Sequence, residues 1–295
     1  MRKSSHVVVV AVLVAAMLAG LHQDSATAEI NDGTSPGWSI YGNFTLDDHP
    51  DTATLGHDPL GCTIKVDRVY NYGLTSTRWY RYVIPGITDF RDCPRGGTAV
   101  ATGKPWTVDD LVLSWTGTPA EPAPLLYVLR NFAFTGQTIP NDPNPAKIGS
   151  GTDFNGDGLK DFWELGWTEG MRIFYRSGES FVLSSPAPWY CNDDTSRTDL
   201  DFAELNGKPG VEVVASYYCA ADQPGFPGSA GRGVIVVSPA TGKRQILLSD
   251  HDVGSVFESN ITDYNGDHLL DIEIRSSFNF PVYYLNDGAG RFSPA

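Results

Sequence analysis

Oxygen-bearing side chains recur at alternate positions in two short segments of the chain. One runs from Asp153 to Asp161 (DFNGDGLKD) and the other from Asp263 to Asp271 (DYNGDHLLD). Each places Asp or Asn at positions one, three, five and nine of a nine-residue loop. Calcium takes roughly six to eight oxygen ligands, and a tight turn with alternate carboxylates and amides supplies such ligands. The pattern therefore predicts a calcium ion at each loop.

The predicted ligand set has the same form in both loops. Position seven is a leucine, and it can offer its backbone carbonyl whatever its side chain is. The predicted ligands are Asp153, Asn155, Asp157, Leu159 and Asp161 in one loop, and Asp263, Asn265, Asp267, Leu269 and Asp271 in the other.

Three further segments match the same frame less well. Their residues at positions one, three, five and nine are Asn43, Thr45, Asp47 and Asp51, then Thr102, Lys104, Trp106 and Asp110, then Glu204, Asn206, Lys208 and Glu212. The five loops start at residues 43, 102, 153, 204 and 263, so the successive offsets are 59, 51, 51 and 59. Near-regular offsets of this size indicate an internal structural repeat.

The weaker copies differ in how well they could hold a cation. The first keeps four oxygen side chains and is a candidate for a third ion. In the second, Trp106 removes the central ligand. In the fourth, the ammonium group of Lys208 is expected to replace the cation between Glu204 and Glu212. We therefore expect about two calcium ions, or about three if the first loop also binds.

An EF-hand is the main alternative for the third loop, because Glu164 stands at its twelfth position. An EF-hand needs a helix on each side, but Pro and Gly residues flank this loop and disfavour helix. The fifth loop has Ile274 at the twelfth position. The flanks and the spacing therefore argue against EF-hand and dockerin modules.

Strand patterns follow each loop. β-Branched or alternating runs at residues 110–115, 211–217 and 271–276 predict one strand per repeat, and further runs near residues 125–129, 172–176 and 233–237 predict another. A weaker run, such as residues 180–183, completes four strands in each unit. The predicted fold class is all-β, and five units of four strands predict a β-propeller with five blades.

The chain resembles the FG-GAP/VCBS repeat family. Two segments carry the resemblance, the loop from Asp153 to Asp161 and the stretch from Val282 to Phe292 (VYYLNDGAGRF). The resemblance spans residues from about 38 to 295. It implies a β-propeller, related to that of integrin α-subunits, with calcium in the turn between the first two strands of a blade. Family propellers often have seven blades, so an incomplete or seven-bladed ring is the alternative to five.

The amino terminus predicts export. Arg2 and Lys3 precede an apolar run over residues 7–18, and Ala26-Thr27-Ala28 provides small residues for cleavage after Ala28. We expect a signal peptide at 1–28, an extension at 29–37 and the propeller at 38–295. The apolar run is shorter than the roughly 20 residues of a transmembrane helix. The expected location is extracellular, with no transmembrane segment.

The net charge of the chain limits the kinds of partner it can bind, and its cysteines predict disulfides. The net charge of −14 should repel nucleic acid and anionic membranes and attract divalent cations. Four cysteines in an exported chain predict two disulfides, with three possible pairings. In the propeller frame all four fall on the face opposite the calcium loops, which favours Cys62–Cys93 and Cys191–Cys219.

Binding is the predicted function, and no catalytic motif is found. The Gly-x-Ser-x-Gly elbow is absent. We expect a binding or adhesion module for a carbohydrate or protein, recognised by the loops from Ser185 to Thr198, which contains Trp189, and from Ala220 to Arg232. The alternatives are a polysaccharide-acting hydrolase or lyase, whose carboxylate separation a sequence does not show, and a structural component of the cell envelope.

Overall fold

The computed structural model is built from strands and turns. It describes residues 27–29, 39–45, 50–70, 75–84, 87, 89, 93–102, 107–115, 125–142, 145–166, 170–184, 199–219, 230–250, 257–276 and 281–295. These residues contain no helix, and hence none that could cross a membrane. The prediction of an all-β fold is confirmed for this part of the chain.

The described strands form five antiparallel sheets, each built from four strands that are consecutive in the sequence. The first three sheets are β2 (Ser39–Gly42), β3 (Asp51–Asp58), β4 (Gly61–Tyr70) and β5 (Thr75–Val83); β6 (Gly96–Val100), β7 (Asp110–Trp115), β8 (Leu125–Arg130) and β9 (Ala133–Pro140); and β10 (Pro145–Thr152), β11 (Asp161–Gly166), β12 (Gly170–Ser177) and β13 (Ser180–Leu183). The last two are β14 (Leu200–Ala203), β15 (Glu212–Cys219), β16 (Gly231–Ser238) and β17 (Lys243–Asp250); and β18 (Phe257–Thr262), β19 (Asp271–Ser276), β20 (Val282–Asn286) and β21 (Phe292–Pro294). The strands predicted around the loops are therefore confirmed.

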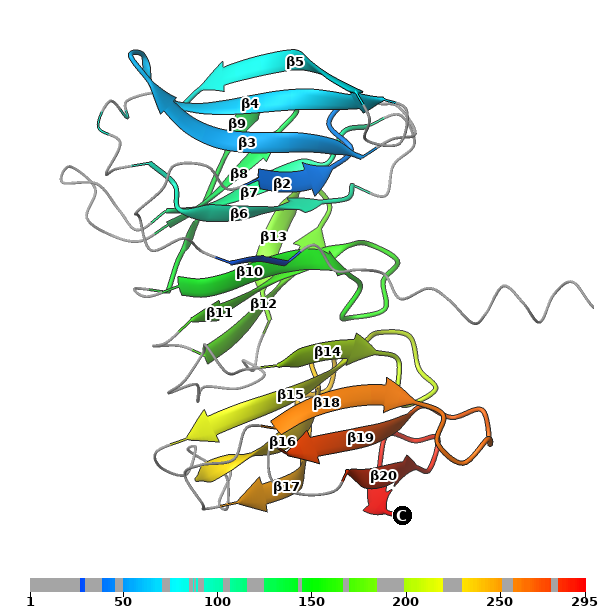
Figure 1. The fold of residues 1–295 in the computed structure, drawn as a ribbon. Coiled ribbons are helices and arrows are strands. Elements are labelled where there is room, and N and C mark those ends of the chain that lie inside the picture. The colour runs from blue at the N-terminus through cyan, green and yellow to red at the C-terminus, as the bar shows by residue number, and fades with distance from the viewer. Residues whose placement is uncertain are drawn as a thin grey trace, which may run out of the picture.

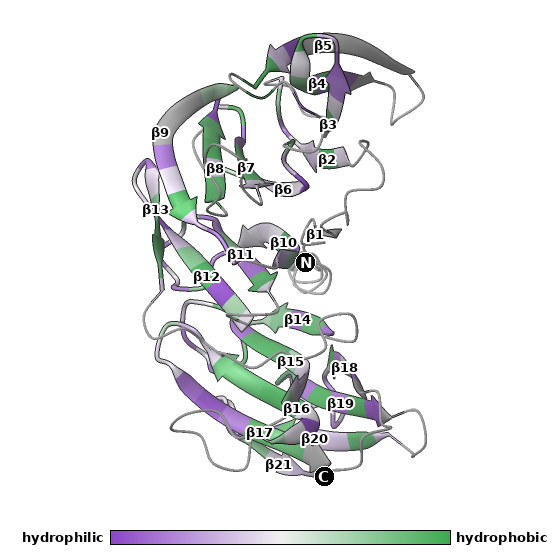
Figure 2. Cartoon of the chain, turned by 90° about the vertical axis from the view of Figure 1, so that its left-hand side faces the viewer, coloured by the Kyte–Doolittle hydropathy of each residue, from purple (hydrophilic) through white to green (hydrophobic). Residues whose placement is uncertain are grey.

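The five sheets stack face to face in the order of the sequence, like the blades of a propeller. The first and fifth sheets lie at opposite ends of the stack (Figure 1). Seen from the side, the stack curves into a crescent (Figure 2). Among the described strands, no ladder joins one of these five sheets to another. The arrangement is propeller-like, and the described strands do not close it into a ring.

A short amino-terminal strand, β1 (Thr27–Glu29), extends the third sheet. It pairs antiparallel with the edge strand β10, placing Ala28 opposite Ile148. This strand crosses the predicted cleavage point after Ala28.

Apolar side chains fill each space between successive sheets. Four clusters of buried residues lie in these spaces, one for each neighbouring pair of sheets. The strands β7 and β11 are buried along their whole length, because sheets cover both of their faces. Trp163 on β11 is 1% exposed and packs beside Phe202 of the next sheet. Burying a side chain of this size stabilises the fold by roughly 2–3 kcal/mol, so Trp163 serves packing.

Two glutamines join the outermost strands of neighbouring sheets in the same way. Gln137 on β9 donates from Nε2 to the Phe181 carbonyl on β13 at 2.7 Å and accepts from the Phe181 amide at 3.1 Å. Gln245 on β17 makes the same two bonds with Phe292 on β21, at 2.7 and 3.1 Å. We call these pairs the glutamine clamps. They link the second sheet to the third and the fourth to the fifth.

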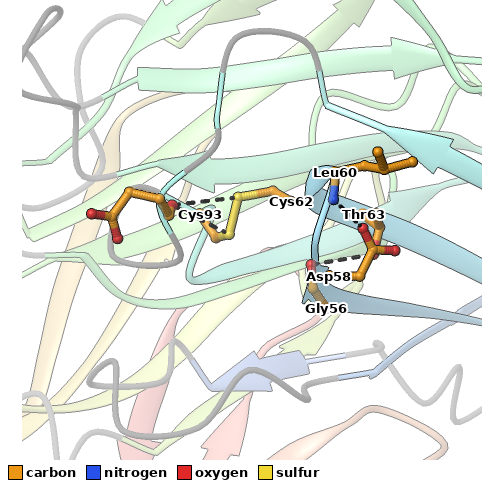
Figure 3. Close-up of a disulfide and its surroundings, with 7 residues drawn as sticks. Gly56, Asp58, Leu60, Cys62, Thr63 and Cys93 are labelled. Carbon is orange, nitrogen blue, oxygen red and sulfur yellow. Dashed lines mark hydrogen bonds between the residues drawn. A yellow bond between two sulfur atoms is a disulfide. The ribbon is translucent and has the colours of Figure 1, made fainter.

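One disulfide is directly described, and it matches the favoured pairing. Cys62 on β4 is bonded to Cys93, just before β6, with 5.6 Å between their Cα atoms. Figure 3 shows the bond beside the tight turn that joins β3 to β4, where the Leu60 amide donates to Asp58. This turn and the predicted calcium loop lie at opposite ends of β3, as expected. Cys219 is also disulfide-bonded; its predicted partner, Cys191, lies outside the described residues.

Candidate metal centres

All five predicted loops occupy the same place in the fold, between the first and second strands of a sheet. Position nine of each loop is the first residue of the second strand. These residues are buried, with at most 4% exposure, and they are Asp51, Asp110, Asp161, Glu212 and Asp271. In the third and fifth loops, positions one, three and five are half-buried or exposed. The five loops aligned in the sequence are thus equivalent in the structure as well. The EF-hand alternative is excluded, because strands and not helices flank the third loop.

The aspartate at position nine holds the loop to its sheet. Asp161 accepts hydrogen bonds from the amide of Phe154 at position two, at 2.9 Å, and from the amide of Arg176 on the third strand, at 2.8 Å. Asp271 accepts from Tyr264 at 3.0 Å and from Asn286 at 2.9 Å in the same way. This structural role was not predicted. A signal for it exists, because position nine stays acidic in loops that have lost their other ligands.

The other predicted ligands fold the loop onto itself. The two oxygens of Asp153 accept from the amides of Gly156 and Gly158 at 2.7 and 2.8 Å. Asn155 accepts from the amide of Asp157 at 3.0 Å, and Asp157 accepts from that of Leu159 at 2.8 Å. In the part of the chain that the structure describes, no three acidic, His or Cys side chains gather as a ready metal site. Here the loop oxygens accept from backbone amides.

The fifth loop repeats this arrangement. Asp263 accepts from Gly266 and His268 at 2.8 and 3.0 Å, and Asp267 accepts from Leu269 at 2.8 Å. His268 has φ 69°, in the left-handed region, where the third loop has Gly158 with φ 85°. His268 is therefore a turn residue.

In the two degenerate loops, side chains bind the carboxylate at position nine, and in the second loop they also neutralise its charge. In the second, Asp110 binds Arg130 at 2.9 and 3.0 Å and Arg176 at 2.8 Å. In the fourth, Glu212 accepts from the amide side chain of Asn206 and from the Leu205 backbone. The expectation for Lys208 is wrong, because its exposed side chain makes no ion pair with any described residue.

The third and fifth loops lack such a neutralising group. Asp161 and Asp271 pair with no ammonium or guanidinium group among the described residues. Burial, together with the nearby negative charges of Asp153 and Asp157, raises the pKa of Asp161 to about 7 against the effect of the two backbone hydrogen bonds. A buried aspartate without a cationic partner therefore occurs in the same two loops that have Asp, Asn and Asp at positions one, three and five. A hard divalent cation fits this donor set in type and charge.

The first loop is described only in part. Asp47 lies outside the described residues. The amide of Phe44 donates to Asp51 at 2.9 Å, which repeats the position-nine contact of the third and fifth loops. The Asn43 amide donates to Asp109 of the neighbouring loop at 2.8 Å, and the buried hydroxyl oxygen of Thr45 has no partner among the described residues.

Neighbouring loops also contact one another. A Cβ atom on Gly156 would lie 2.5 Å from the carbonyl carbon of Pro209 in the fourth loop. A Cβ atom on Gly290, in the last hairpin, would lie 2.8 Å from the Cβ of Asn206. The third loop, the fourth loop and the last hairpin therefore follow one another along this side of the crescent.

One buried carboxylate outside the nine-residue loops also has a raised pKa, Glu164 on β11. Burial raises the pKa of Glu164 to about 7, although Arg172 opposes the rise. Arg172 binds Glu164 from Nε at 3.1 Å and the Pro140 carbonyl at 3.0 Å. Glu164 is 0% exposed, so a substrate cannot reach it in this structure. The pair is an internal ion pair between the second and third sheets.

The loops predicted to recognise a ligand are mostly outside the described residues. This holds for the loop from Ser185 to Thr198, including Trp189, and for most of the loop from Ala220 to Arg232. From the second loop, only residues 230–232 are described, where β16 begins. A scan of the chain against protein-family models and a search of curated proteins both found no match.

Proposed function

We propose that this protein is a secreted, calcium-stabilised propeller of the FG-GAP/VCBS type that acts as a binding module for an extracellular carbohydrate or protein. Its five sheets serve as five blades of an open arc. The observation that carries the proposal is the pair of buried aspartates, Asp161 and Asp271, which lack a counter-charge in the two loops richest in oxygen ligands.

The cation would bind where the negative charge is concentrated. Asp153, Asn155, Asp157, Asp161 and the Leu159 carbonyl would hold it in the third loop, and the equivalent residues in the fifth. Bound calcium would supply the positive charge that Arg130 and Arg176 supply to Asp110 in the second loop. It would then favour the native state by mass action.

Binding fits the scaffold better than catalysis. Stacked sheets and a disulfide make a rigid frame, and loops on a rigid frame commonly carry recognition. Glu164, a buried carboxylate away from the loops whose pKa is raised to about 7, is engaged with Arg172. The predicted signal peptide and the disulfide support an extracellular location.

Calorimetric titration of the chelator-treated protein tests the proposal. About two calcium ions should bind, and calcium should raise the melting temperature. Asp157→Ala and Asp267→Ala should each remove one ion, because each deletes the central carboxylate of one loop. Glu204→Ala, at position one of the fourth loop, is the matched control and should leave the count unchanged. Absence of calcium binding, or loss of an ion in the control only, would refute the metal assignment.

A further inference from the structure

Position two of the loops marks how one sheet docks on the next. Phe44 is 2% exposed and lies beside Phe132 of the second sheet, with 5.7 Å between ring centroids. Phe154 is 0% exposed and meets Phe202 of the fourth sheet at 5.5 Å. Leu205 is 2% exposed within the cluster between the fourth and fifth sheets. In these three loops, position two points forward and is covered by the following sheet.

The fifth loop has an aromatic residue at the same position, but it is open to solvent. Tyr264 is 51% exposed, because the fifth sheet is the last in the stack (Figure 1). Its ring lies on that of Tyr283, with 3.8 Å between centroids and 17° between planes. The two rings form one aromatic platform on the outer face of the last sheet.

Polar side chains surround this platform on the same face. Asn260, Glu273 and Tyr283 are opposite one another on adjacent strands, and their side chains point away from the fourth sheet. Glu273 accepts from Arg275 at 2.9 and 3.0 Å, from Asn260 at 3.2 Å and from the Tyr283 hydroxyl at 3.3 Å. Glu273 itself is only 5% exposed, so its role is to fix the orientation of the more exposed Asn260, Arg275 and Tyr283 beside the rings. We call Tyr264, Tyr283, Asn260, Glu273 and Arg275 together the terminal tyrosine platform.

We propose that the terminal tyrosine platform binds a neutral saccharide. The inference rests on the proposed function as a binding module and gives it a site and a ligand class. A sugar ring presents C–H groups that pack on an exposed aromatic face and hydroxyls that bond to flanking amide, guanidinium and phenol groups, here those of Asn260, Arg275 and Tyr283. The platform offers both kinds of group within one rigid sheet.

Charge argues against an anionic ligand at this site. Glu258 and Glu273 lie on the outer face with Arg275, and Asp263 and Asp267 lie in the adjoining loop. The whole chain carries a net charge of −14. Nucleic acids, acidic polysaccharides and anionic lipid surfaces would be repelled.

A second copy of the chain is the other partner to consider, since its first sheet could follow the fifth. The outer face of that first sheet carries Thr54, Lys65 and Arg81, which are opposite one another on β3, β4 and β5. The faces that cover Phe44, Phe154 and Leu205 are lined with apolar residues. At these described positions, the first sheet presents polar and charged side chains in place of the apolar surface that receives position two elsewhere.

Binding to a panel of neutral polysaccharides (mannan, xylan, β-glucan and galactan), with heparin as the acidic control, tests this inference. The protein should bind at least one neutral polysaccharide and should not bind heparin. Tyr264→Ala should weaken binding about tenfold, which corresponds to about 1.4 kcal/mol. Tyr264→Phe should keep most of it, because the ring remains. Tyr41→Ala is the matched control, since Tyr41 is 62% exposed on the opposite terminal sheet, and it should change the dissociation constant less than twofold.

The outcomes separate this inference from the proposed function. Equal effects of Tyr264→Ala and Tyr41→Ala would refute the platform while leaving saccharide binding in place. Retention on heparin alone, or concentration-dependent self-association lost in Tyr264→Ala, would refute the ligand class. Calcium stoichiometry and melting temperature, measured on the same variants, report on the metal loops and on folding. A normal calcium response without polysaccharide binding would refute only the further inference.

Discussion

At the scale of single residues, the most informative position is the ninth of each loop. The same carboxylate can hold the loop to its sheet through backbone amides and carry a charge that needs a partner. In the second sheet the partner is a pair of arginines, Arg130 and Arg176. Asp161 lacks such a partner among the described residues, and its pKa is raised to about 7.

The raised pKa of Asp161 predicts a pH-dependent effect of calcium. Between about pH 4 and pH 7 the native protein holds a proton on Asp161 that the unfolded chain has released, so this group makes the metal-free protein less stable as pH rises through that window. Calcium binds the ionised form and displaces the proton. The calcium-induced increase in melting temperature should therefore be larger at pH 7.5 than at pH 5.0. Equal increases at the two pH values, measured by scanning calorimetry, would contradict the assignment of Asp161.

The residue types of the calcium loops were predictable from the sequence, but the contacts made by their side chains were not. Alternate Asp and Asn residues marked the loops, because their spacing is local. The role of Arg176 could not be predicted, because Asp110 lies 66 residues away and on another sheet. Lys208 was misassigned for a related reason: in the fold, Asn206 reaches Glu212 instead.

At the scale of elements, polar side chains link sheets that pack mainly through apolar clusters. Arg176 on β12 donates to Asp110 at 2.8 Å and to the Val100 carbonyl at 3.3 Å, and both acceptors belong to the second sheet. Its guanidinium also lies over the ring of Phe181, 4.6 Å from the centroid. Strands were predictable from alternation and β-branching, whereas these links depend on how sheets stack.

Arg176→Met tests the strength of this link. The change leaves Asp110 buried with only Arg130 as its cation, so it should lower the free energy of unfolding by about 3 kcal/mol. Arg291→Met is the control, because the Arg291–Asp287 pair is exposed to solvent and should contribute little to stability. Urea unfolding followed by tryptophan fluorescence would measure both. Similar losses in the two variants would show that Arg176 is not a structural link.

The described disulfide should stabilise the first two sheets. Cys62 and Cys93 are 31 residues apart, and a closed loop of that length is worth roughly 3–4 kcal/mol in the chain-entropy account. The double variant Cys62→Ala/Cys93→Ala should unfold at a lower urea concentration than the parent. An unchanged midpoint would mean that the packing of Ile64 and Leu113 already fixes this junction.

At the scale of the whole molecule, the stack of sheets is an open crescent. Its two terminal sheets lie far apart (Figures 1 and 2), and charged residues lie on their outer faces, Lys65 and Arg81 on one and Glu273 and Arg275 on the other. The repeat itself was predictable from the spacing of the loops. The curvature was not, because it depends on the side chains between sheets.

An open shape predicts a large radius of gyration in small-angle X-ray scattering. A compact domain of this length would have a radius of about 18–19 Å. The processed chain, from residue 29 onward, should give a clearly larger value that is independent of protein concentration. A value of about 18–19 Å would indicate a closed ring.

The glutamine clamps have a consequence for how the molecule behaves in a crowded solution. The outermost strand of any sheet exposes peptide groups that another chain can use as a template for amyloid-like pairing. In β13 and β21, the amide and carbonyl of Phe181 and Phe292 are already bonded to Gln137 and Gln245. Each glutamine thus occupies peptide groups that a neighbouring strand would otherwise bond, which should disfavour pairing of these edges with another chain.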